Sequence, residues 1–165
     1  MTILMPLILA AAPLLAAAPL SSVEYDAHVD FSRYVTWSWG GEVTAATSPL
    51  ADKRIREAIE NGLSAHGLSR AESGGALLVG YHASKTTDIA LAPIDTAAAA
   101  TPTGIRYAEK GSLVVVMRDA ASGDVVWRGY VTGVLRYSPT AIAAQIKAAV
   151  DALLERLPPA SRPAP

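Results

Sequence analysis

The sequence contains no cysteine, which excludes disulfides, thiolate metal sites, thiol nucleophiles and lipid attached through a thioether. It also has no excess of either charge, since Lys plus Arg number 14 and Asp plus Glu number 15. Long blocks of like charge are missing as well. The chain therefore has no net field that would draw nucleic acid to it, and we expect no nucleic-acid partner.

Common hydrolase motifs are absent too. The chain has no Gly-x-Ser-x-Gly, no Ser-x-x-Lys and no His-Glu-x-x-His. His82, Ser84 and Asp88 offer the residue types of a hydrolytic triad, but so short a spacing says nothing about their geometry. We therefore predict no catalytic residues and no enzymatic activity, and keep a small hydrolase that uses His82 as the alternative.

The N-terminal stretch from Met1 to Val23 has no charged side chain. Its Ala- and Leu-rich run ends in small residues, which is typical of a secretory signal peptide, so residues 1–22 are predicted to be a cleaved signal. An uncleaved membrane anchor is the competing interpretation, and an ordered part of the fold is a third. Pro6, Pro13 and Pro19 argue against one regular helix across the stretch, so no membrane span is expected in the mature form.

Two amphipathic helices are predicted, and each begins at a Ser-Pro pair. Ser48 and Ser138 can act as N-caps, and the proline after each stands where a missing N–H has no consequence. Apolar residues then recur at three- and four-residue steps, which indicates one buried face per helix. They are Leu50 or Ala51, then Ile55, Ala58, Ile59, Gly62 and Leu63 in the first helix, and Ile142, Ile146, Ala149, Val150, Leu153 and Leu157 in the second.

Strands are predicted at 35–39, 76–82, 111–119 and 125–136. The last two form a hairpin, because only residues 120–124 separate them and Gly123 can take a positive φ. Val23 to Tyr25 can start a strand, but residues 26–30 interrupt it. In the last strand, alternation predicts an inner face that packs against the helices, made of Val125, Trp127, Gly129, Val131, Gly133 and Leu135. Gly129 and Gly133 on this face would let a helix backbone approach the sheet closely. The opposite face carries Arg128, Tyr130, Thr132 and Arg136.

These elements predict an α+β fold. At 165 residues the chain suits one domain, placed at 23–157, with a long loop at 84–110 and a Pro-rich tail at 158–165. Two helices with one apolar stripe each cannot cover both faces of a sheet. We therefore expect a single sheet of about four strands, in the order β-α-β-β-β-α, with both helices packed on one face.

Several segments together resemble the DUF4136 family, a domain of unknown function found in small bacterial cell-envelope proteins that are often lipoproteins. The resemblance spans Tyr25 to about Leu157, and the segments that carry it are Tyr25-Asp26, 30–34 with Thr36 and Trp39, 77–82, 111–114, Asp119, Gly123 and 126–129. It implies an exported envelope protein with no established activity. Lipoprotein members carry a cysteine after the signal, and this chain has none. The expected location is therefore the periplasm, or the inner membrane through an uncleaved N-terminal anchor.

A binding role is the preferred interpretation, with a small periplasmic hydrolase as the alternative. Arg128, Tyr130, Arg136 and His82 are the candidate binding residues, since Arg and Tyr are enriched at interfaces. The expected partner is an envelope protein, lipid or glycan, which would bind to the exposed sheet face and the 84–110 loop. Asp26, His28 and Asp30 have metal-ligand chemistry, but a turn that already uses Asp30 as a cap favours solvated residues. We expect no metal and no cofactor.

Overall fold

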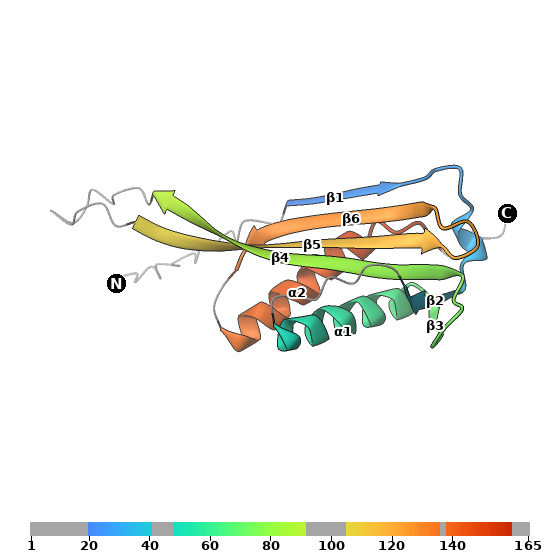
Figure 1. Ribbon diagram of the computed structural model, residues 1–165, viewed down its shortest axis with the longest axis horizontal. Coiled ribbons are helices and arrows are strands. Elements are labelled where there is room, and N and C mark those ends of the chain that lie inside the picture. The colour runs from blue at the N-terminus through green and yellow to red at the C-terminus, as the bar shows by residue number, and fades with distance from the viewer. Residues whose placement is uncertain (1–19, 41–47, 92–104, 136–137, 160–165) are drawn as a thin grey trace, which may run out of the picture.

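A computed structural model describes residues 20–40, 48–91, 105–135 and 138–159 (Figure 1). One sheet lies against two helices, and both helices cover the same face (Figure 1). The sheet has six strands in the order β1-β6-β5-β4-β2-β3. In chain order the elements are β1 Leu20–Tyr25, the 3-10 helix η1 Phe31–Arg33, β2 Thr36–Trp39, α1 Pro49–Ala65, β3 Ser69–Arg70, β4 Leu77–Leu91, β5 Ile105–Asp119, β6 Val125–Val134 and α2 Pro139–Leu154.

The predicted α+β fold with one sheet and two helices is confirmed, but the expectation of about four strands is wrong. Of the two further strands, β1 forms because all its residues from Leu20 to Tyr25 pair antiparallel with β6. The other, β3, contains two residues and pairs in parallel with β2. Neither strand shows an apolar alternation in its sequence. Each forms through backbone pairing with a neighbouring strand, which its own sequence does not reveal.

The prediction of a loop at 84–110 is wrong for residues 84–91 and 105–110, which belong to strands. Strand β4 continues to Leu91 and β5 already begins at Ile105, with an unbroken antiparallel register from Leu77↔Asp119 to Leu91↔Ile105. Pairing of β5 with β6 starts only at Lys110↔Val134. The far ends of β4 and β5 therefore form a two-stranded arm that projects past the helices (Figure 1). Residues 92–104 of the predicted loop lie outside the described residues.

Both helices begin as predicted. The Ser48 side chain accepts a hydrogen bond from the Ala51 N–H, and the Ser138 side chain accepts one from the Ala141 N–H. The helices pack closely where Gly62 of α1 meets Leu154 of α2, since a Cβ at Gly62 would lie 2.4 Å from Leu154 Cδ1. Among the described residues, neither α1 nor α2 qualifies as a membrane-spanning helix.

The core lies between the sheet and the helices. Trp127 is fully buried there, beside Leu153 of α2. A Cβ on Gly129 would lie 2.5 Å from the Trp127 ring and 3.2 Å from Leu153 Cδ2. Gly129 therefore makes room for an indole on its own strand, and not for a helix backbone as the sequence suggested. Trp37 is buried as well, and Trp39 is half-buried against it.

Candidate functional site

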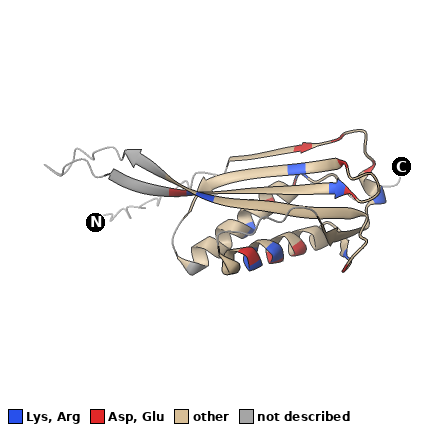
Figure 2. Ribbon diagram, in the orientation of Figure 1, with Lys and Arg blue, Asp and Glu red and all other residues tan. Residues whose placement is uncertain are grey.

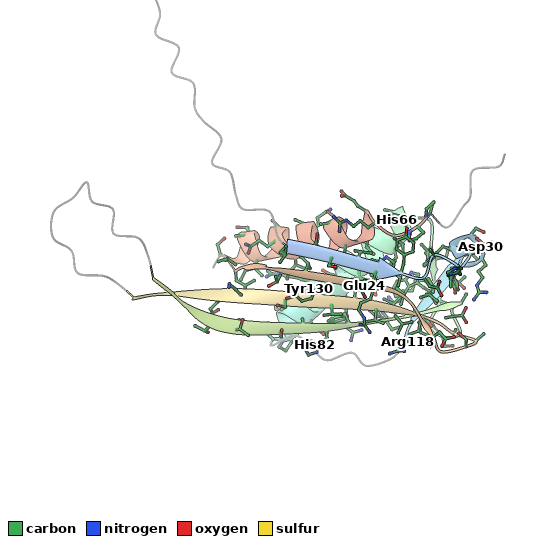
Figure 3. All side chains as sticks on the ribbon, turned by 90° about the horizontal axis from the view of Figure 1, so that it is seen from above. Glu24, Asp30, His66, His82, Arg118 and Tyr130 are labelled. Carbon is green, nitrogen blue, oxygen red and sulfur yellow. The ribbon has the colours of Figure 1, made fainter. Side chains whose placement is uncertain are left out.

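The sheet face opposite the helices carries the candidate binding residues. Tyr130, Val114 and His82 stand side by side on β6, β5 and β4, because Val114 pairs with Tyr130 on one side and with His82 on the other. Tyr130 retains 38% of its accessible surface and His82 is exposed. Figure 3 shows the helices on one side of the sheet, with His82 and Arg118 on the other. We call this surface, built from alternate residues of β1, β6, β5 and β4, the outer face.

Arg128 lies on the outer face in the next row of the sheet. It is exposed and stands opposite Glu24 of β1 in the register. Neither side chain forms a hydrogen bond or ion pair with any described residue. Arg136, the fourth candidate, lies outside the described residues. The sequence therefore placed Arg128 and Tyr130 correctly on one exposed face, and the strand register adds His82 to them.

The rest of the outer face is mixed in character. Thr132 Oγ1 donates a 3.1 Å hydrogen bond to the Gly111 carbonyl, and Ser112 Oγ donates one of 3.2 Å to Thr132 Oγ1. Val114 and Val116 are half-buried further along β5, beside Tyr130 and Arg128 of β6. Figure 2 shows acidic and basic positions close together along α1 and again where β4 and β5 cross, but only isolated charged positions on β1 and β6. The outer face therefore combines apolar patches with a few charges, as docking surfaces do.

His82 lines neither of the two best-defined hollows among the described residues. One hollow, of about 450 Å³, lies by the end of α1 and is lined by Glu60, Leu68 and Arg70 among others. Another, of about 270 Å³, lies between α1 and α2. His82 and Ser84 occupy positions i and i+2 of β4, on an open sheet face. The Asp88 side chain lies outside what the structure describes, so the triad alternative gains no geometric support.

The acidic turn weighed as a metal site uses its carboxylates locally. Asp26 Oδ1 accepts a 2.8 Å hydrogen bond from the His28 N–H, and this bond is the largest cause that lowers the pKa of Asp26 below 3.8. Asp30 Oδ1 accepts hydrogen bonds from the N–H and the hydroxyl of Ser32, as the cap of η1. Within the described ranges, no three His, Asp or Glu side chains gather into a metal-binding group.

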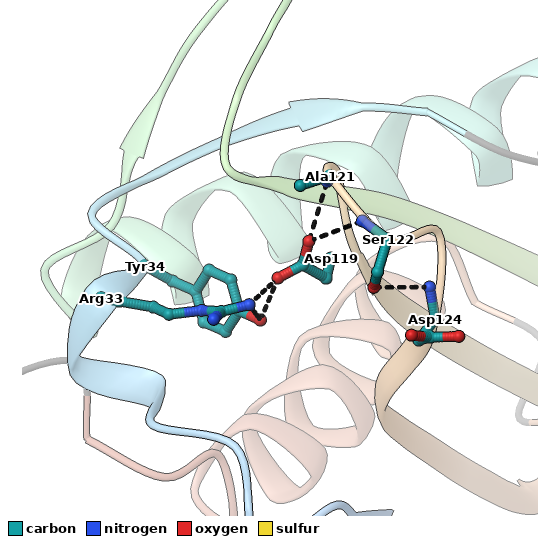
Figure 4. Close-up of polar contacts among 6 residues, drawn as sticks. All are labelled: Arg33, Tyr34, Asp119, Ala121, Ser122 and Asp124. Atoms are coloured by element: carbon teal, nitrogen blue, oxygen red, sulfur yellow. Dashed lines mark hydrogen bonds and ion pairs between the residues drawn. The ribbon is translucent and has the colours of Figure 1, made fainter.

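Two of the segments that carry the family resemblance meet in space, a contact that the sequence alone did not reveal (Figure 4). Asp119 is buried at the end of β5 and accepts a 2.8 Å hydrogen bond from the Tyr34 hydroxyl. Its other oxygen accepts from the N–H groups of Ala121 at 2.8 Å and Ser122 at 3.1 Å. Arg33 forms an ion pair with the same carboxylate. This cluster joins η1 to the turn between β5 and β6.

The charge state of this cluster follows from its contacts. The hydrogen bond from Tyr34, followed by those from the Ser122 and Ala121 N–H groups, lowers the pKa of Asp119 from 3.8 to about 2. Burial is the main cause that raises the pKa of Tyr34 above 10.0. Asp119 is therefore an anion and Tyr34 a neutral donor at neutral pH. Both carboxylate oxygens of Asp119 and the Tyr34 hydroxyl already have hydrogen-bond partners within the protein, so these contacts hold η1 against the turn between β5 and β6.

A second polar cluster fastens α1 to the sheet. The Tyr81 hydroxyl of β4 donates to Asp52 Oδ1, and Arg56 Nε donates to Asp52 Oδ2 at 3.0 Å. The Arg56 guanidinium also lies over the Trp39 ring, 5.0 Å from its centroid. Burial, followed by the hydrogen bond to Asp52, raises the pKa of Tyr81 to about 12. The cluster is structural by the same reasoning as that around Asp119.

Comparison with protein families finds that residues 21–159 match the domain of unknown function DUF4136. The chain belongs to this family. The resemblance drawn from the sequence motifs is thereby confirmed. A search of curated proteins found no match. Membership in DUF4136 brings a fold and no known activity, so no catalytic residues of the family can be placed on this chain.

Solved structures similar to this DUF4136 chain share its fold. A DUF4136 family protein from Bacteroides thetaiotaomicron is 13% identical, with a TM-score of 0.57, over 88% of this chain and 99% of that one. A PelC dodecamer from Paraburkholderia phytofirmans is 14% identical, with a TM-score of 0.52, over 82% and 95%. A PDZ domain protein from Parabacteroides distasonis is 13% identical, with a TM-score of 0.58, over 86% of this chain, which spans only 36% of that protein.

Proposed function

We propose that this DUF4136 protein is an exported, non-enzymatic binding domain whose outer face docks a protein of the cell envelope. Export is supported by the uncharged, apolar stretch that precedes β1, which has the character of a signal peptide. Residues 1–19 of the predicted signal lie outside the described residues, and because β1 pairs with β6 from Leu20 onward, we place the end of the signal before Leu20 and not after residue 22. The absence of cysteine makes a lipid anchor through a thioether impossible, which favours a soluble or N-terminally anchored form.

The observation that carries the docking role is the position of Arg128, Tyr130 and His82 on one helix-free face. Arg and Tyr are the residue types that contribute most at protein interfaces, because each offers a large contact area together with directed hydrogen bonds. Arg128 has no partner among the described residues, so its donors are available to one. The half-buried Val114 and Val116 beside them supply apolar area.

A protein partner fits this face better than a lipid or glycan does. Anionic lipid would require a concentrated positive surface, and here Glu24 stands directly opposite Arg128. A small glycan would require a concave site with converging polar groups, and neither hollow described above includes an outer-face candidate. A mixed sheet face with an exposed Tyr is suited to a second protein surface.

Photocrosslinking in intact producing cells tests the proposal. A benzophenone amino acid at Tyr130 or His82 should form an adduct with one defined envelope protein. The matched control is the same amino acid at Lys53, an exposed position on the outward side of α1. Adducts at Tyr130 and His82 but not at Lys53 support the proposal. No adduct at the outer face, or the same adducts from all three positions, would overturn it.

The hydrolase alternative is tested separately. Turnover of ester or glycoside substrates by the purified protein, lost in His82→Ala, would favour that alternative. Equal, background rates for both proteins are expected here.

A further inference from the structure

Strand β1 stands at the edge of the sheet. Strand β6 pairs with one side of it, and no described strand pairs with the other. Natural edge strands are usually blocked by lysine, proline or a bulge. From Leu20 to Tyr25, β1 has none of these, and its register with β6 is regular throughout. Its one charged side chain, Glu24, stands beside Arg128 of β6. Leu20 and Tyr25 are also 73% and 52% exposed. The edge is therefore open to another strand.

The backbone groups that point outward from this edge can be identified. The Asp26 N–H donates to the Val126 carbonyl at 3.1 Å, so the backbone of Asp26 points toward β6. Because direction alternates along an antiparallel strand, the even-numbered residues of β1 point the same way. The odd-numbered residues Ser21, Val23 and Tyr25 therefore point their N–H and C=O groups toward the open side.

These outward groups are self-complementary. If two copies of β1 meet antiparallel with Val23 opposite Val23, each Ser21 lies opposite a Tyr25, and all three outward residues of each strand find partners. Shifting the register by two residues in one direction places Pro19, which has no N–H, opposite Tyr25. Shifting it the other way places Ala27 opposite Ser21, and Ala27 lies in the turn closed by the Val29 N–H and the Asp26 carbonyl. The centred register alone uses the whole strand.

The side chains agree with this register. On the outer face, each Glu24 would lie opposite Ser22 of the other copy and not opposite another carboxylate. Arg128 of the same copy stands beside each Glu24 and offsets its charge. On the inner face, the exposed Tyr25 would lie over Ser21 of the other copy. Pairing would thus cover apolar surface without placing like charges opposite one another.

We propose that β1 pairs with β1 of a second copy of this chain, around a two-fold axis at Val23, to join two six-stranded sheets into one. The pairing uses the sheet edge and leaves the outer face of each copy free. It is therefore independent of the proposed docking function, and each can fail without the other.

Disulfide trapping tests the register directly, because the chain has no cysteine of its own. In the proposed pairing, Ser22 faces Glu24 of the other copy as a pair without mutual hydrogen bonds, whose Cα atoms are about 4.5 Å apart and suit a disulfide. Both side chains are exposed. The variant Ser22→Cys/Glu24→Cys should form a covalent dimer under mild oxidation. Its matched control, Leu20→Cys/Glu24→Cys, is out of register and should remain monomeric on a non-reducing gel.

The mass in solution gives a second readout. Light scattering should give twice the monomer mass for the unmodified protein and the monomer mass for Ser21→Pro, whose lost N–H points to the open edge and not to β6. Circular dichroism should show Ser21→Pro folded. A monomeric unmodified protein, equal trapping by both cysteine pairs, or trapping of β1 by a different protein would overturn the proposal.

Discussion

The Tyr34 hydroxyl lies 2.8 Å from Asp119 Oδ2, and this hydrogen bond joins residues 85 positions apart in the chain. It connects the C-cap of η1, just before β2, to the end of β5, a strand in the interior of the sheet (Figure 4). Both residues belong to segments that carry the family resemblance. Their shared role is structural, which explains why these two segments belong to the recognisable motifs of the family fold.

Tyr34→Phe should destabilise the protein by about 1.5–3 kcal/mol, the range for a hydrogen bond to a charged group. The ring keeps its buried position, so the change removes the hydroxyl alone. Urea unfolding measures the loss. Ser32→Ala is the matched control, because it also removes a hydroxyl that donates to a carboxylate, that of Asp30, but at an exposed position. A loss for Tyr34→Phe no greater than for this control would contradict the assignment.

Asp119→Asn should make the free energy of unfolding less dependent on pH in the acidic range. Because the pKa of Asp119 is lowered from 3.8 to about 2 in the folded protein, its carboxylate stabilises the fold above pH 3.8. That contribution is lost as the pH falls from 3.8 to about 2. The stability difference between the original protein and the variant should therefore be constant near neutral pH and shrink over this interval. If the stability difference between the two proteins stays constant down to about pH 2, the Asp119 charge does not contribute to stability.

Tyr81→Phe should have its signature at high pH. Since the pKa of Tyr81 is raised from 10.0 to about 12, the folded state retains the proton and gains stability below pH 10.0. This contribution is lost as the pH rises from 10.0 to about 12. Denaturant midpoints measured across that interval should fall more steeply for the original protein than for Tyr81→Phe. Parallel curves would argue against the contact with Asp52.

Gly75→Ala should destabilise the protein by about 3 kcal/mol, at the upper end of the range for overpacking. A Cβ there would lie 2.3 Å from the Trp37 carbonyl carbon and 2.4 Å from the Ser38 nitrogen, which are backbone atoms of β2 and cannot move aside. Gly74→Ala is the control, because its φ of +70° is mildly strained but nothing lies within 4 Å. It should lose only about 1 kcal/mol. Equal losses would mean that β2 yields to the new methyl group.

The sequence predicted those elements whose local signal and packing agree. Ser48 and Ser138 mark both helix starts, and most of the apolar residues that recur behind them are buried or half-buried. Leu50, the first position proposed for the stripe, is 55% exposed. The β5–β6 hairpin formed with Gly123 at a φ of +79°, as its turn chemistry required. In each case one short segment contains the information.

The errors occurred where structure depends on a distant partner. Strand β1 reads as an interrupted fragment until β6 is beside it, and the continuation of β4 past Ser84 has polar residues with no apolar alternation. The candidate site divides in the same way. Alternation along β6 placed Arg128 and Tyr130 together, but His82 joins them only through the register of β4 with β5. The contact of Tyr34 with Asp119 had no local signal at all.

The central claim, that the outer face docks a protein, is tested most directly by its accessibility in the cell. Single cysteines at His82 and at Ala148, an exposed position on α2, should react equally with a maleimide in the purified protein. In intact producing cells, His82→Cys should be protected and Ala148→Cys should remain reactive. Equal labelling of both positions in cells would contradict the account.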